Sequence, residues 1–150
     1  MTLLTKIVRR RPAELLLAAE ALTLLAFFRV CLALIPVRRI IQSITHGPAG
    51  VAPVAELGET AGARISQTSR RVQWAVRAAA RHSPVEFVCF PQTLAAYTML
   101  RWRGVASTMV YGVSRSPEEG LIAHTWLEAA GGCVVGGEEA SGFTAIDRWT

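Results

Sequence analysis

The sequence predicts an α+β fold in which helices come first and a small antiparallel sheet comes last. Apolar, helix-favouring residues dominate the first 45 positions, and helical spacing returns at residues 63–81 and 94–101. Residues 107–128 then alternate as two strands around a turn, and a third short apolar run follows at 133–135. We therefore expect an N-terminal helical extension (1–45), a loop or linker (46–62) and a folded core (63–150).

The extension contains a long apolar segment after a basic start. Pro12 suits the first turn of a helix that continues to Pro36, where a short amphipathic helix follows. Glu20 and Arg29 bracket a longest uncharged run of only eight residues, 21–28, whereas a membrane-spanning helix needs about 20. No small-residue cleavage site of a signal peptide follows. We expect this helix to pack on the core, or to bind a partner or a membrane surface.

The middle of the chain alternates between loop and helix. Gly, Pro and Ala fill residues 46–62, where His46 is expected to be a solvated loop histidine. From 63 to 81 one helix face is apolar and the arginines lie off it. His82 is expected to interact with the end of that helix, and Pro84 breaks it.

Composition limits the partners and the compartment. The net charge of +5 would suit an acidic peptide or an anionic membrane, but aromatic residues are only 7% and no nucleic-acid module is visible, so nucleic acid is not expected. Three widely spaced cysteines without a CxxC pair indicate free thiols in a reducing, cytoplasmic setting and no structural zinc.

Cys89 is the strongest candidate for a reactive group. It stands just before a helical pattern that Gly104 ends, and Pro91 fits the first turn of that helix. A cysteine in this position faces free backbone N–H groups and the positive end of the helix dipole, which favour the thiolate. Gln92, one turn into the helix, is expected to be a polar residue of the helix start.

His124 lies in the middle of the second predicted strand, which makes it the candidate base for the Cys89 thiol. Trp126 shares its face of the strand and would shield the imidazole from water. Glu128 lies on the same face, but at about 3.3 Å per residue it is roughly 13 Å away and cannot orient the ring. We expect Glu128 to be a surface charge at the strand end.

These blocks together resemble the lasso-peptide leader peptidases, which belong to the transglutaminase-like branch of the papain-type cysteine enzymes. The resemblance covers about residues 65–146, and the N-terminal helices look like the extension of the short, stand-alone members. It is carried by VQWAVRAAAR (72–81), the Cys89 helix closing in LRWRG (100–104), AHTWLE (123–128), VVGGEE (134–139) and FTAI (143–146).

The resemblance implies a papain/transglutaminase-like core, a helix carrying Cys89 as nucleophile packed on a sheet carrying His124 as general base. The family's third residue is usually an Asp about a dozen positions after the His, but no Asp occurs there in this sequence. Glu138 is the best substitute and Glu139 the next, whereas Asp147 is too far along the chain.

The implied activity is removal of the leader from a ribosomally made precursor peptide through a Cys thioester. The resemblance also implies a separate leader-binding protein, a downstream ATP-dependent lasso cyclase and a possible ATP dependence of cleavage. The sequence contains no GxxxxGK[ST] pattern, so no cofactor is assigned. Two alternatives stay open: acyl transfer or deamidation by the same thioester, and a non-catalytic scaffold that binds partners through its apolar helices.

Overall fold

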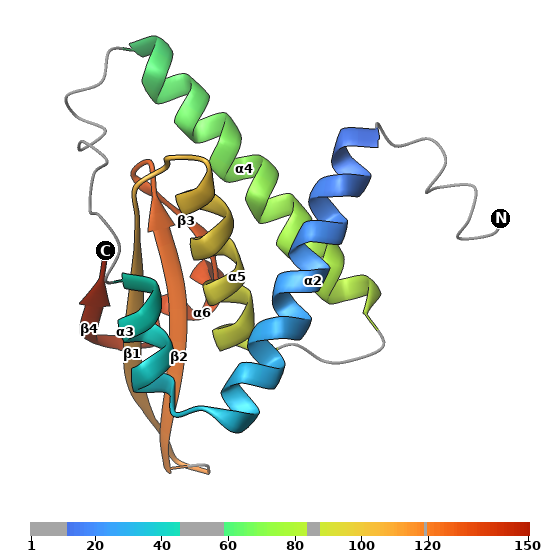
Figure 1. The fold of residues 1–150 in the computed structure, drawn as a ribbon. Helices are drawn as coiled ribbons and strands as arrows, with labels where there is room; N and C mark the ends of the chain where they lie inside the picture. Colours follow the sequence, from blue (N-terminus) through green and yellow to red (C-terminus); the bar gives the residue numbers. More distant parts are fainter. Residues whose placement is uncertain (1–11, 46–58, 84–87, 119) are drawn as a thin grey trace, which may run out of the picture.

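The computed structural model describes residues 12–45, 59–83, 88–118 and 120–150. Figure 1 shows the elements in chain order. The helices are α2 (Pro12–Leu34), α3 (Val37–Thr45), α4 (Glu59–His82), α5 (Cys89–Trp102) and the short α6 (Gly137–Ala140). The strands are β1 (Ser107–Ser116), β2 (Gly120–Ala129), β3 (Gly132–Val135) and β4 (Thr144–Trp149).

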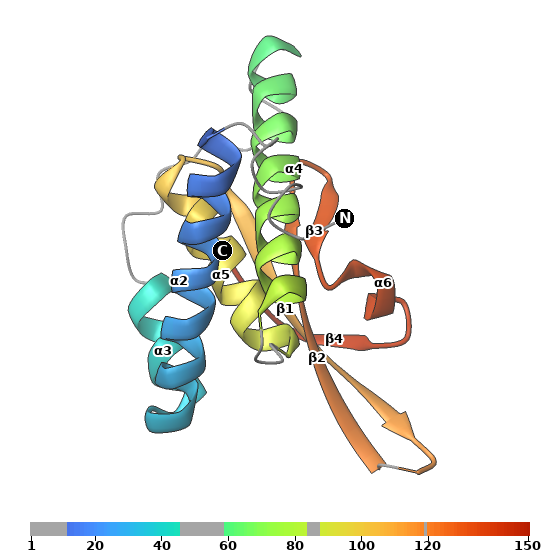
Figure 2. The ribbon, with the colours of Figure 1, turned by 90° about the vertical axis from the view of Figure 1, so that its right-hand side faces the viewer.

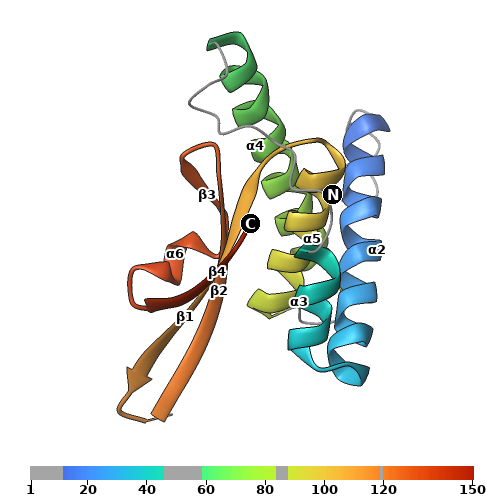
Figure 3. The ribbon, with the colours of Figure 1, turned by 60° about the vertical axis from the view of Figure 1, so that its left-hand side comes forward.

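The four strands form one antiparallel sheet in the order β3-β2-β1-β4. Helices α2, α4 and α5 lie on one side of the sheet, and α6 lies on the other (Figure 3). Figure 2 shows α4 and α2 beside α5, and both helices contact it. The predicted α+β class is therefore confirmed, with the helix that begins at Cys89 packed on a small antiparallel sheet.

Helix α5 is the centre of the structure. It is apolar on nearly all sides because α2, α4, β1 and β2 surround it. Its fully buried side chains include Leu94, Met99 and Leu100, which belong to the same core cluster as Leu25 of α2 and Val76 of α4. The described helices of the N-terminal extension therefore share one core with the rest of the chain.

Helix α2 is fixed to α5 by a partly buried ion pair. Arg103, directly after α5, donates from Nη1 and Nη2 to the two carboxylate oxygens of Glu20 at 2.8 and 2.7 Å. Arg103 Nη1 also donates to the carbonyl of Met99. This two-pronged geometry positions α2 more strictly than apolar contacts alone, because guanidinium and carboxylate match only in one plane.

The length argument against a membrane helix was wrong. Helix α2 is continuous over 23 residues and, by length and composition alone, is apolar enough to cross a membrane. A mostly buried core helix of a soluble protein and a signal sequence pass the same test; α2 places Ala21, Leu25 and Phe28 in the core, but only 17% of its apolar window is buried. The charge at Glu20 serves the fold through Arg103 and does not interrupt the helix.

Other boundaries shift in ways that have local causes. Helix α4 begins at Glu59, so residues 59–62 belong to it and not to the predicted linker, of which 46–58 lie outside the described residues. The break at Pro36 and the ring contact of His82 Nδ1 with the Ala78 carbonyl, at 2.8 Å, are as predicted. The first hairpin is longer than expected, and α6 and β4 were not predicted.

Replacing Glu20 by Gln is expected to lower the free energy of unfolding by about 1–2 kcal/mol, because Arg103 loses a charged acceptor in a partly buried position. Urea denaturation measures this change. Glu118→Gln in the exposed turn after β1 is the control and should leave the midpoint in place. Equal midpoints for the two variants would show that the ion pair does not hold α2.

Candidate active site

Cys89 is the first residue of α5, and Val88 precedes it in an extended conformation. Pro91 is fully buried in the first turn, where its missing N–H costs nothing. The Cys89 thiol therefore sits at the end of a helix whose first N–H groups have no intrahelical acceptor. Such groups can hydrogen-bond a negative oxygen next to the sulfur.

A buried hydroxyl pair attaches this helix start to β2. Thr93 Oγ1 lies 3.3 Å from both the carbonyl oxygen and the hydroxyl of Thr125, and 3.0 Å from the Cys89 carbonyl oxygen. Both threonine side chains are completely buried. Because a buried hydroxyl without a partner is costly, this contact fixes the position of α5 along β2.

His124 is held by the turn that follows β3. Its Nε2 lies 2.8 Å from the carbonyl oxygen of Gly136, and its ring is almost fully buried. A carbonyl oxygen can only accept, so this bond requires the proton on Nε2 and leaves the lone pair on Nδ1. Gly136 has φ +76°, and a Cβ there would lie 2.6 Å from the Thr125 carbonyl oxygen and 3.1 Å from Nε2. Only glycine fits this position.

Aromatic rings cover His124 on its face of the sheet. The ring of Trp126 stacks at 6.2 Å and that of Phe143 lies at 5.1 Å, so the predicted shielding by Trp126 is confirmed. Glu128 accepts a hydrogen bond from Trp126 Nε1 at 2.9 Å and pairs with Arg148. Glu128 does not contact His124, as predicted, but it is more than a surface charge because it holds Trp126.

The two candidate acids have different partners. Glu138 pairs with Arg77 of α4 at 2.9 Å, and Glu139 places a carboxylate oxygen 3.6 Å from His124 Nδ1. Both belong to α6, a helix that the sequence did not reveal. The carboxylate near the imidazole is therefore the second choice from the sequence and not the first. Asp147 lies on β4 and lines a cleft that Cys89 and His124 also line, but among the described residues it forms no ion pair with His124.

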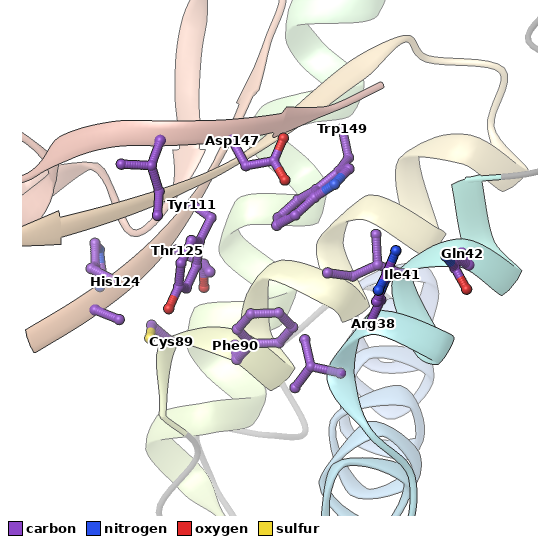
Figure 4. Close-up of a pocket in the computed structure, with 13 residues that line it drawn as sticks. Arg38, Ile41, Gln42, Cys89, Phe90, Tyr111, His124, Thr125, Asp147 and Trp149 are labelled. Atoms are coloured by element: carbon purple, nitrogen blue, oxygen red, sulfur yellow. The ribbon is translucent and has the colours of Figure 1, made fainter.

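Cys89 and His124 both line two neighbouring clefts, each with a volume of about 670 Å³. An apolar cleft, shown in Figure 4, lies between α3, the start of α5 and β4. A charged cleft lies between α4 and α6 and contains Arg77, Arg81 and Glu139. In Figure 4 the Cys89 sulfur and His124 lie at the same end of the apolar cleft.

Within the described part of the chain, no hydrogen bond joins Cys89 Sγ to His124. The pleat of β2 explains this, because Thr125 faces α5 and its neighbour His124 must face the other way. Strand β3 pairs with β2 only at Leu127–Ala129 and no longer pairs with it at position 124. The His124 ring therefore lies along a part of the β2 edge that β3 does not cover. Cys89 and His124 therefore line the same two clefts at this edge without a hydrogen bond between them.

A family model described as the transglutaminase-like superfamily matches residues 22–148. The chain belongs to this superfamily. The match begins inside α2 and includes Cys89, His124 and α6, so the N-terminal helices are part of the matched region. Comparisons with curated proteins and with solved structures gave no significant match.

Membership in the transglutaminase-like superfamily supports a cysteine-dependent enzyme. Of the three thiols, Cys133 is a poor nucleophile because partial burial and the nearby Glu128 raise its pKa. Its thiol also lies within hydrogen-bonding distance of the carbonyl oxygens of Leu127 and Val135. Cys31 is half-buried in α2 against the core.

Several site residues of this transglutaminase-like chain could not be predicted from the sequence. Thr93 and Thr125 looked like ordinary helix and strand residues, although Thr93 lies one turn after Cys89 and Thr125 adjoins His124. The Gly136-Gly137 pair is evident in the sequence. Its contact with His124 could not be predicted, because the partner is a backbone carbonyl, which every residue type has. Among the described residues, no group of three His, Cys, Asp or Glu side chains could hold a metal.

Gly136→Ala is expected to cost about 3 kcal/mol or more of stability and to displace His124, because the new Cβ overlaps the Thr125 carbonyl. The matched control is Gly131→Ala, which has the same φ of +76° but open space around the Cβ, and should cost only about 1 kcal/mol. Urea denaturation gives the two costs, and NMR shifts of the His124 ring nitrogens report the tautomer. Equal costs and unchanged shifts would contradict the assigned role of Gly136.

Proposed function

We propose that this protein is a cysteine peptidase that removes the leader from a ribosomally made lasso-peptide precursor. One observation supports it above the others: Cys89 and His124 lie where two clefts meet. An extended peptide that occupies both clefts brings its backbone past the start of α5. The proposed substrate, a lasso-peptide precursor, comes from the sequence blocks that resemble the leader peptidases.

In the proposed reaction, His124 Nδ1 takes the proton of the Cys89 thiol, and the thiolate attacks the scissile carbonyl carbon. The C=O electron pair moves to oxygen, and N–H groups at the α5 start stabilise that oxyanion. As the intermediate collapses, the C–N bond breaks and the leaving amine takes the proton from Nδ1. Water, deprotonated by Nδ1, then hydrolyses the thioester and restores the thiol.

This cycle requires Nδ1 to approach Sγ, which substrate binding would bring about. Catalytic hydrogen bonds are often long or unformed in a free enzyme and tighten in the complex. The Gly136 carbonyl keeps Nε2 protonated throughout, so the base is always Nδ1. When Nδ1 is protonated, the Glu139 carboxylate at 3.6 Å stabilises the imidazolium. We therefore assign the acid's role to Glu139 in place of Glu138.

The same proposal includes the other participants. A separate leader-binding protein would present the precursor, and an ATP-dependent cyclase would use the freed N-terminus, all in the cytoplasm. The exposed apolar side chains of α2, among them Leu16, Phe27 and Leu34, offer a surface on which such a partner could dock. They also leave room for a weak membrane-surface contact.

Cys89→Ala is expected to lower the rate of leader removal by a thousandfold or more, about the loss seen when a nucleophile is deleted. The assay is mass spectrometry of the precursor incubated with the enzyme and the leader-binding protein. Cys133→Ala is the matched control and should retain activity, because that thiol is hydrogen-bonded to backbone carbonyls and lines neither of the two clefts at Cys89.

Undiminished cleavage by the Cys89 variant would rule out the peptidase assignment. A product joined to an added amine donor, with no chain scission, would instead favour acyl transfer. Native far-UV circular dichroism of the variant confirms that the loss is chemical.

Glu139→Gln is expected to lower kcat about two- to fivefold, because the imidazolium loses an adjacent but largely exposed negative charge. Glu138→Gln is the control on the same short helix and should leave kcat near the wild-type value, since its carboxylate faces Arg77. Steady-state kinetics on a precursor peptide measures both. A larger loss in the Glu138 variant would reverse the assignment of the acid.

A further inference from the structure

We infer that the apolar cleft is the subsite for a bulky apolar side chain, one or two residues before the scissile bond. This rests on the proposed function and adds a substrate preference and a direction of binding. Helix α3 of the N-terminal extension forms one wall of this subsite and β4 the other. Neither element carries Cys89 or His124, so both are free to set specificity.

The lining of the cleft indicates what it binds. Its large side chains are Val37 and Ile41 of α3, Phe90 beside the nucleophile, Tyr111 of β1, and Ile146 and Trp149 of β4. Figure 4 shows Ile41, Phe90, Tyr111 and Trp149 grouped around the same space. The polar lining residues Arg38, Gln42 and Asp147 are exposed. A substrate side chain that enters the cleft therefore leaves water and contacts apolar surface. This transfer favours Leu, Ile, Met or Phe.

The position of His124 fixes the direction of the peptide. The leaving amine receives its proton from Nδ1, so the leaving half must lie on the side of that nitrogen. The group beside Nδ1 is Glu139, which lines the charged cleft and not the apolar one. The leaving half therefore occupies the charged cleft, and the acyl half, which becomes the thioester, occupies the apolar cleft.

The charged cleft suits the product released there. Cleavage creates a new N-terminal ammonium group on the leaving half, and the carboxylates of Glu138 and Glu139 line that cleft. Arg77 and Arg81 are present as well, so the cleft is not strongly charged overall. We expect weak side-chain preference on the leaving side and clear apolar preference on the acyl side.

Peptidyl chloromethyl ketones test this directly, because they present only the acyl half. The Cys89 sulfur forms a bond to the methylene carbon as chloride leaves, and mass spectrometry of the intact and digested protein locates the adduct. Reagents with Leu or Phe at the first or second position should label Cys89 at least about tenfold faster than those with Gly, Asp or Lys. Adducts at Cys31 or Cys133 are counted separately.

Ile146→Glu should remove most of the preference for the Leu and Phe reagents over the Gly reagent. Ile146 is 58% exposed on β4, so the fold should tolerate the change, and Val37→Glu on α3 is the second variant. Leu121→Glu at the hairpin end, 73% exposed and remote from the cleft lining, is the matched control.

Labelling of Cys89 without side-chain preference, or a preference that both cleft variants retain, would overturn this inference and leave the peptidase proposal standing. Absence of Cys89 labelling by every reagent would refute the peptidase proposal and this inference together.

Discussion

The contact between Thr93 of α5 and Thr125 of β2 sets the geometry of the site. It fixes the helix on the strand, so the first turn of α5 places Cys89 beside the middle of β2. The same contact commits Thr125 to the helix side of the sheet. His124 must then point to the other side, where Trp126, Phe143 and the Gly136 carbonyl surround it. The candidate nucleophile and the candidate base therefore lie on either side of one sheet edge.

The N-terminal helices contribute to this arrangement in two ways. Helix α2 covers α5 and is attached to its end through Glu20 and Arg103. Helix α3 then brings Val37 and Ile41 to the cleft that opens at Cys89. The sequence predicted the N-terminal extension as a separate segment. Its helices instead share the core with the rest of the chain, and α3 forms part of the apolar cleft. The family match, which starts within α2, agrees with this organisation.

The sequence was sufficient for the features that depend on local pattern. Helical spacing, Pro36 and Gly104 predicted the helices, and the alternation around Trp126 placed it beside His124. Features that depend on long-range pairing were missed. Strand β4 is largely exposed, so it has little apolar alternation, and it is a strand because β1 offers it an open edge. Helix α6 is only four residues long, too short for a periodic signal.

The choice between Glu138 and Glu139 illustrates the same limit. Both are acidic, adjacent and similarly spaced from His124, so the sequence offers no basis for preferring the one near the ring. The decision depends on Arg77, which lies far away in the chain and attracts Glu138 to α4. A one-residue difference in a short helix thus determines which carboxylate faces the imidazole.

The central claim is that Cys89 forms a thioester with the N-terminal half of its substrate. Rapid acid quenching of a reaction between the enzyme and its precursor peptide, followed by intact-mass and peptide mapping, tests this most directly. A transient adduct on Cys89 with the mass of the leader minus water is expected. Cleavage that proceeds without such an adduct, or with the leader attached to another residue, would contradict it.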